Sequence, residues 1–221
     1  MPISVIAISH TNGAGGERIG RIVAEQLGFR YVDEEIISTA IDKEGIDPHL
    51  LADAEKRKSI LARLVEGLGR IGVAGTAMGS LTIRDAPTLT ARRASSAGAK
   101  STGRSDDFRA FVLEAIQETA DLGEVVIVAH AASMAIGRRD DLLRVFITAP
   151  AKVRTKRLAE AEHIAEEEAT KLIQRSDARR AEYIRRFHAI DAELSTHYDL
   201  VVNTDRLSVE EACEIVTQAA K

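Results

Sequence analysis

The 221-residue sequence predicts a three-layer α/β/α fold built on a five-stranded parallel sheet. Five short apolar runs show no polar alternation, as expected of strands that are buried on both faces. Each run is followed by a stretch with helical periodicity, and this order favours parallel strands with helices on both sides of the sheet. Hydrophobic residues make up 45% of the chain, so residues 1–221 are expected to form a single domain with a sizeable core.

The first unit of this pattern is a strand, a loop of small residues and a helix. The strand covers Ile3–Ile8, the loop covers His10–Gly16, and the helix opens at Glu17. Backbone N–H groups in such a loop and the N-terminus of the helix both favour an anion. The small residues Gly13–Gly16 therefore predict a bound phosphate, with a tight turn between strand and helix as the alternative.

This loop departs from the standard phosphate-binding pattern G-x-x-x-x-G-K-[ST]. His10 stands in place of the first glycine, Gly16 in place of the lysine and Glu17 in place of the hydroxyl residue. The shape of a nucleotide site is predicted, whereas the lysine that would neutralise phosphate charge is missing.

The next part of the chain changes composition twice. Phe29–Val32 predicts a second strand, which Asp33 ends, and helical patterns dominate residues 33–70. Residues 70–104 are rich in Gly, Ala, Ser and Thr, and between Arg84 and Arg104 they carry five basic residues against one acid. This stretch is either a solvated flexible insertion or a basic flap that orders over a phosphate ligand.

The second half contains three further strands and their helices. The expected strands are Val125–Val128, Leu143–Thr148 and Leu200–Val202. The expected helices begin after a cap at Ser105 or Asp106, run over Ala151–Glu160, continue as two charged pieces within residues 164–194, and end with one that Ser208 and Glu211 open as a capping box.

Ligands of parallel sheets bind at the carboxyl ends of the strands, so the residues that follow the strands should line one rim. These residues are His10–Gly16, Asp33, His130, Pro150 and Asn203. A metal site on the rim would need a third ligand beside His10 and His130, and only Asp33 offers one, so no metal site is predicted.

Composition narrows the class of protein. The net charge of −4 gives no electrostatic case for binding nucleic acid. Cys213 is the single cysteine, which excludes a disulfide framework, and its spacing predicts a buried helical position. No apolar run approaches the roughly 20 residues of a membrane span, and a strand that starts at Ile3 leaves no room for a signal peptide. A cytoplasmic protein is expected.

Six motifs in order resemble the cytidylate kinase-like family, a divergent branch of the nucleoside monophosphate kinases. They are GAGG, YVDEEII, VVIVAHAA, VFITAPAKVRTKRL, RSDARRAEY and YDLVVNTDRLSVEEA, and the resemblance covers residues 1–43 and 105–221. It implies a P-loop nucleoside kinase-like core, an acceptor-side helical region at 33–70, and an arginine-rich helical lid at 151–194. The stretch 70–104 has no counterpart in it.

The resemblance also implies site residues. Nucleotide binding falls on Asn12, Gly13, Ala14, Gly15, Gly16, Glu17 and Arg18; catalysis on Arg18, Arg154, Arg175 and Arg180; acceptor binding on Asp33, His130 and Asp177. Arg18 is the candidate replacement for the missing lysine. The family usually has G-R-G where this chain has Ala129-His130-Ala131, and a histidine cannot clamp phosphate bidentately as arginine does.

The function expected from this resemblance is Mg²⁺-dependent phosphoryl transfer from ATP to a nucleoside monophosphate, CMP or dCMP. The missing lysine and arginine leave two alternatives open: a nucleotide-binding regulatory protein with little or no turnover, and a kinase of a different small-molecule acceptor. The expected partners are small-molecule nucleotides, without nucleic acid or membrane, and a homodimer is left open.

Overall fold

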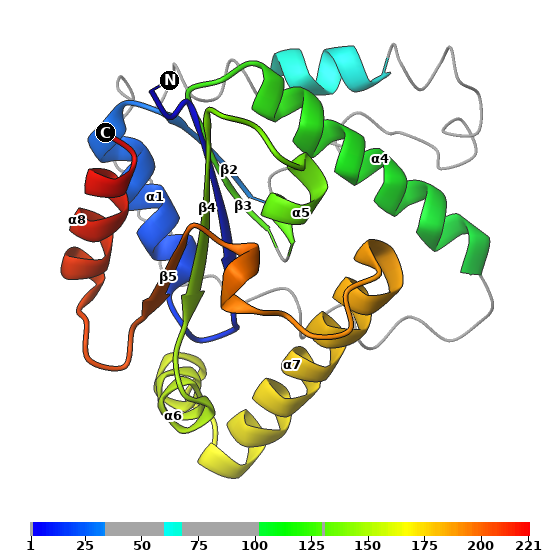
Figure 1. Cartoon of the computed structure of the whole chain (residues 1–221). Coiled ribbons are helices and arrows are strands. Elements are labelled where there is room, and N and C mark those ends of the chain that lie inside the picture. Colours follow the sequence, from blue (N-terminus) through cyan, green and yellow to red (C-terminus); the bar gives the residue numbers. More distant parts are fainter. Residues whose placement is uncertain (1, 34–59, 68–101, 130) are drawn as a thin grey trace.

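The computed structural model describes residues 2–33, 60–67, 102–129 and 131–221 (Figure 1). Its centre is a five-stranded sheet in the order β2-β3-β1-β4-β5, with every neighbouring pair parallel. The strands are β1 (Val5–His10), β2 (Arg30–Asp33), β3 (Val125–Val128), β4 (Leu142–Thr148) and β5 (Leu200–Asn203). The predicted fold class is confirmed. The bounds of β3 are as predicted, and those of the other strands differ from the prediction by at most two residues at either end.

Helices cover both faces of the sheet, as the apolar strands require (Figure 1). The helices α1 (Gly16–Leu27) and α8 (Val209–Ala219) lie on one face, and α4 (Thr102–Asp121) and α5 (Ala132–Ile136) lie on the other. Successive residues of a strand point to opposite faces, so β1 serves both cores. Ile6 and Ile8 pack with α1 and α8, whereas Val5 and Ala7 pack with α4 and α5.

A glycine in the second turn of helix α1 lets the helix pack closely against the sheet. A Cβ atom added to Gly20 would lie 2.5 Å from a methyl carbon of Val128 on β3. No side chain fits in that space, so Gly20 allows the helix backbone to approach the strands. This close packing helps to set where α1 begins relative to the sheet, and therefore where the loop before it lies.

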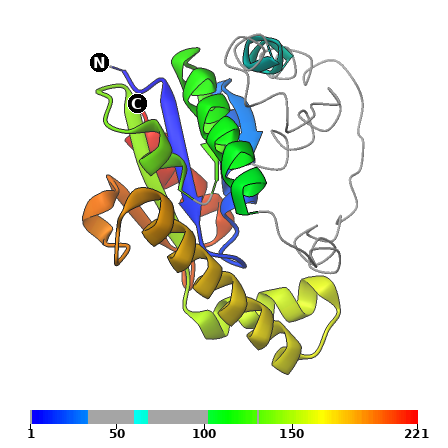
Figure 2. The ribbon, with the colours of Figure 1, turned by 90° about the vertical axis from the view of Figure 1, so that its right-hand side faces the viewer.

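A hairpin of two helices, α6 (Ala151–Glu162) and α7 (Glu166–His188), crosses the carboxyl ends of the strands (Figure 2). It has a small core of its own, formed by Leu158, Ala159, Ala169 and Ile173. Helix α7 is continuous over 23 residues, so the prediction of two helical pieces within residues 164–194 was wrong. Its many charges hid a single buried stripe that includes Arg180 as well as apolar residues.

Two other boundaries are informative. Helix α4 begins at Thr102, before the predicted caps at Ser105 and Asp106. The capping box of α8 is confirmed: the Ser208 hydroxyl accepts from the Glu211 N–H at 3.1 Å, and the Ser208 N–H donates to the Glu211 carboxylate at 2.8 Å. Most of the predicted acceptor-side region and basic insertion, together with His130, lies outside the described residues.

A short helix at residues 60–67 packs beside α4, in the same core cluster, through Ile60, Leu61, Leu64 and Val65. Cys213 is fully buried on α8, as its spacing predicted. None of the helices in the described ranges combines the length and the apolar character that crossing a bilayer requires.

Candidate phosphate site

The loop between β1 and α1 has the conformation of an anion cradle. Gly13 (φ 79°) and Gly15 (φ 84°) adopt left-handed backbone conformations that other residues reach only with strain. A side chain at Gly13 would also meet Arg154, whose Cβ lies 3.0 Å from the added atom. The first N–H groups of a helix have no intrahelical acceptor, so the N-terminus of α1 adds donors and a positive dipole at the same place.

The first residue of α1 has no room for a side chain. A Cβ atom added to Gly16 would lie 2.3 Å from Cβ, 2.5 Å from Cγ and 2.9 Å from Cδ2 of His10. Real Cβ atoms essentially never approach carbon so closely, so a lysine at position 16 would force His10 or its backbone to shift. The two departures from the standard loop pattern, at the positions of the first glycine and the lysine, are therefore coupled.

Arg154 is a buried side chain that contacts the backbone of this loop. It is 5% exposed and forms a bidentate ion pair with Asp177 of α7, with N–O distances of 3.0 and 2.8 Å. Its other N–H groups donate to the carbonyl oxygens of Ala149 at 2.8 Å and Asn12 at 3.3 Å. One guanidinium therefore connects the end of β4, α7 and the loop between β1 and α1 (residues 11–15), which is called the phosphate loop below after its predicted ligand.

Arg180 holds the first residue of the loop in the same way. It is 5% exposed, pairs with both oxygens of Glu193 at 2.9 and 2.5 Å, and donates to the carbonyl oxygen of His10 at 3.1 Å. The Tyr198 hydroxyl donates to the same Glu193 carboxylate. Burial, and then this carboxylate, raise the pKa of Tyr198 above its usual range. The Arg180 guanidinium lies 5.3 Å from the ring centroid of Phe146.

Thr204 is a third connection, which the sequence analysis missed. Its buried hydroxyl lies 3.0 Å from the carbonyl oxygen of Ala14 in the loop and 3.3 Å from that of Thr148 on β4. Arg157 of α6 donates to the same hydroxyl at 3.0 Å and to the Thr204 carbonyl oxygen at 2.6 Å. The rule that named Asn203 as a rim residue points equally to Thr204, the first residue after β5.

The structure brings some of the predicted residues together and not others. Residues 12–17, Arg154, Asp177 and Arg180 meet around the loop. Arg18 is exposed, and its guanidinium lies 3.7 Å from the carboxylate of Glu210 on α8. Arg175 is exposed on α7, and Asp33 ends β2, which β3 separates from β1. Burial, and then the charge of Asp33, raise the pKa of Tyr31.

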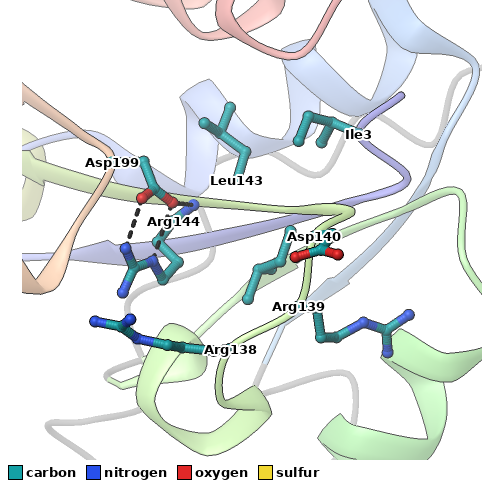
Figure 3. Close-up of a pocket in the computed structure, with 8 residues that line it drawn as sticks. Ile3, Arg138, Arg139, Asp140, Leu143, Arg144 and Asp199 are labelled. Carbon is teal, nitrogen blue, oxygen red and sulfur yellow. Dashed lines mark hydrogen bonds and ion pairs between the residues drawn. The ribbon is translucent and has the colours of Figure 1, made fainter. Parts of the chain in front are cut away.

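A hollow of about 480 Å³ lies at the opposite edge of the sheet, where the strands begin (Figure 3). Ile3, Arg138 and Asp140 line it, together with a bidentate pair between Arg144 and Asp199 whose shortest N–O distance is 2.6 Å. Hydrogen bonds from Arg144 lower the pKa of Asp199. Ligands of parallel sheets bind at the carboxyl edge, so this hollow is on the wrong side of the sheet for the predicted chemistry.

The model of the cytidylate kinase-like family matches residues 5–206, which span the phosphate loop, both helices of the hairpin and all five strands. The chain belongs to this family. A cytidylate kinase from Sulfolobus acidocaldarius is 31% identical over 115 residues, and one from Pyrococcus horikoshii is 35% identical over 103 residues. These matches cover 50% and 46% of this chain, and 62% and 52% of the relatives. The chain thus spans about half to three fifths of the curated relatives it matches.

The fold is also found among solved structures. An uncharacterized protein from Eubacterium ventriosum matches 98% of this chain and 98% of its own, with a TM-score of 0.57 and 16% identity. At this identity the match concerns the fold alone. The family membership that the sequence motifs predicted is confirmed by the family match.

Proposed function

We propose that the protein transfers the γ-phosphoryl group of ATP to a nucleoside monophosphate, with CMP or dCMP as the acceptor. The observation that carries this proposal is a left-handed glycine loop at the N-terminus of α1, at the carboxyl edge of the sheet, in a chain of the cytidylate kinase-like family. Phosphoryl transfer depends mainly on positioning and on neutralising charge, and such a loop supplies donors for both.

In this reaction the bond between the γ-phosphorus and the β–γ bridging oxygen breaks, and a bond to a phosphate oxygen of the acceptor forms, giving ADP and a nucleoside diphosphate. Residues 12–17 would bind the ATP phosphates through backbone N–H groups. Arg154 and Arg180 would keep the loop in shape through the carbonyl oxygens of Asn12 and His10, which they contact. Arg18 and Arg175 remain candidates for direct contact with the transferred group.

Mg²⁺ would be held chiefly by the phosphates of ATP, as in other sites where this ion binds through substrate oxygens. The described residues fit this arrangement, because the left-handed glycine loop forms an anion cradle for those phosphates. Asp33, His130 and Asp177 stay predicted acceptor-binding residues. In the structure, Asp177 is the partner of Arg154.

One observation favours a second candidate function, a nucleotide-binding regulatory protein without turnover. Both buried lid arginines already have carboxylate partners, Asp177 and Glu193, and both donate to the loop backbone. If they keep these partners with ATP bound, neither can stabilise the transferred phosphoryl group directly. The regulatory candidate therefore predicts ATP binding with no ADP formation.

The two candidates are separated by incubating the purified protein with ATP, Mg²⁺ and a panel of monophosphates while measuring ADP. We expect ADP formation to depend on a pyrimidine monophosphate and to be fastest with CMP or dCMP. ATP binding by calorimetry with no turnover above background would contradict the kinase proposal and support the regulatory one. Turnover with a non-nucleotide acceptor alone would reassign the substrate. Full activity in Arg18→Ala would remove Arg18 from its predicted role.

A further inference from the structure

We propose that His10 is a phosphate-binding residue that takes the place of the loop lysine, donating a hydrogen bond and positive charge to the bound triphosphate. This inference rests on the proposed nucleotide site and adds a residue to it. It is carried by the position of the imidazole, which occupies the space that a side chain at position 16 would use.

The space argument comes from the atoms around Gly16. The three heavy atoms nearest to an added Cβ all belong to His10: Cβ, Cγ and Cδ2, at 2.3–2.9 Å. In the standard loop pattern the lysine leaves the helix at this residue. The imidazole therefore occupies the space where a lysine side chain at position 16 would begin. It reaches that place from the end of β1 instead of from the start of α1.

Each ring nitrogen of His10 lies near an oxygen atom that can accept a hydrogen bond. Nδ1 lies 3.4 Å from the carbonyl oxygen of Thr11, which can only accept, and Nε2 lies 3.9 Å from the carboxylate of Glu17 on α1. Among the described residues, two further charged pairs lie at the loop: Arg180 of α7 with Glu193, and Arg154 of α6 with Asp177 of α7.

Those arginine charges are already neutralised, and this gives the imidazole its role. Arg154 and Arg180 each share a bidentate pair with a carboxylate, so neither adds net charge at the loop. His10 is different because its side chain is 17% exposed and lies beside the exposed carboxylate of Glu17. A triphosphate entering the loop can displace that carboxylate and take over the ring N–H. The triphosphate carries several negative charges, whereas the carboxylate carries one.

Position and charge can be tested separately with three variants. His10→Leu fills the same space without a donor or a charge. Gly16→Lys keeps the histidine and forces a clash. The double variant His10→Gly/Gly16→Lys removes all three clashing atoms and restores the standard lysine. His163→Asn, at the exposed C-cap of α6, is the matched histidine control. Thermal melting identifies any variant that fails to fold.

The readouts are ADP formation and calorimetric ATP affinity, each measured from pH 5.5 to 8. We expect His10→Leu to lose about 10²-fold in kcat/KM, the typical effect of removing one preorganised donor. Gly16→Lys should lose more, and the double variant should recover to within about tenfold of wild type. ATP affinity should fall with rising pH in wild type and His163→Asn more steeply than in the double variant, since lysine stays charged. The titration of ATP itself is common to all.

The outcomes distinguish this inference from the proposed function. If ATP affinity depends on His10 and on pH but no ADP forms, the kinase function fails and the phosphate-binding role stands. If ADP forms but His10→Leu keeps the wild-type affinity and pH profile, the kinase function stands and the role of His10 is overturned. A double variant that folds but is no better than His10→Leu would also overturn it.

Discussion

The two edges of the sheet use the same chemistry for different ends. At the amino edge, Arg139 forms a bidentate pair with Asp141 in the segment before β4, and Arg144 of β4 forms one with Asp199, which precedes β5. At the carboxyl edge, Arg154 and Arg180 form similar pairs but also donate to backbone oxygens of the phosphate loop. The side chains of Arg154 and Arg180 are each 6% exposed, whereas those of Arg139 and Arg144 are 25% and 22% exposed.

This difference shows that the role of an arginine–carboxylate pair depends on how deeply it is buried and on what else the arginine contacts. At the amino edge the pairs lie where the strands begin and are partly exposed to water, and ion pairs in such places contribute little to the free energy of unfolding. At the carboxyl edge the pair is buried, so its loss leaves an uncompensated charge and also frees a loop that is proposed to bind phosphate. Substitutions at the two edges should therefore separate stability from nucleotide affinity.

The largest effect is expected at the carboxyl edge, for Arg180→Met. Among the described residues, Glu193 would keep Tyr198 alone as a partner while staying largely buried, so the free energy of unfolding should fall by about 4 kcal/mol. ATP affinity should fall too, because the hydrogen bond to the His10 carbonyl oxygen is lost. Denaturant unfolding and calorimetry measure the two quantities. Arg185→Met, an exposed change on the same helix, is the control, and equal destabilisation by both would contradict the account.

Gly16→Ala should destabilise the protein by about 3 kcal/mol, because its Cβ overlaps His10 and the interior tolerates added atoms poorly. Gly67→Ala, where an added Cβ meets nothing within 4 Å, is the matched glycine control. Adding His10→Gly to Gly16→Ala should restore most of the loss. No restoration in the double variant would show that the clash with His10 is not the cause.

Thr204→Val keeps the size of the side chain and removes the hydroxyl that joins the loop, β4 and α6. The carbonyl oxygen of Ala14 loses a donor, so a cost of about 1.5 kcal/mol is expected, with a several-fold loss of ATP affinity. The exposed substitution Thr196→Val serves as the control in both measurements. Stability lost without any change in affinity would mean that the loop is held by the two arginines alone.

The smallest effect is expected at the amino edge, for Asp141→Asn. Hydrogen bonds from Arg139, and then from Ser4, hold the pKa of Asp141 well below its usual range. A carboxyl with a lowered pKa stabilises the fold above the unfolded value near 4, and this contribution is lost as the pH falls below it. We expect a loss of about 1 kcal/mol at pH 7 that shrinks below pH 4, with ATP affinity unchanged. A change in affinity would contradict the separation of the two edges.

The fold was predictable because its signals are local. Each buried strand is a short apolar run, the left-handed glycines sit in an obvious strand–helix junction, and the capping box at Ser208 and Glu211 is three residues long. The position of the phosphate loop followed from the same signals. The parallel strand order also made it predictable that the loops after β1, β4 and β5 meet at one edge, whereas His130 of the predicted rim lies outside the described residues.

The contacts within the site were not predictable, because they join residues far apart in the chain. Nothing local links His10 with Arg180, or Ala14 with Thr204, which are 170 and 190 positions apart. In the sequence, His10 and Gly16 are two separate departures from the standard loop pattern. Only their packing shows that the histidine occupies the space that a side chain at position 16 would need. Asp177 likewise matched an acceptor position in the resemblance, while its distance to Arg154 is a product of the helical hairpin.

Amide hydrogen exchange with and without ATP and Mg²⁺ tests the central claim most directly, because it reports on both edges in one sample. We predict that saturating ATP slows exchange in peptides covering residues 10–18, at the phosphate loop and the first turn of α1. Exchange in peptides covering residues 138–144, beside the amino-edge hollow, should not change. Slower exchange at residues 138–144 with no change at residues 10–18 would contradict the assignment of the nucleotide site to the carboxyl edge.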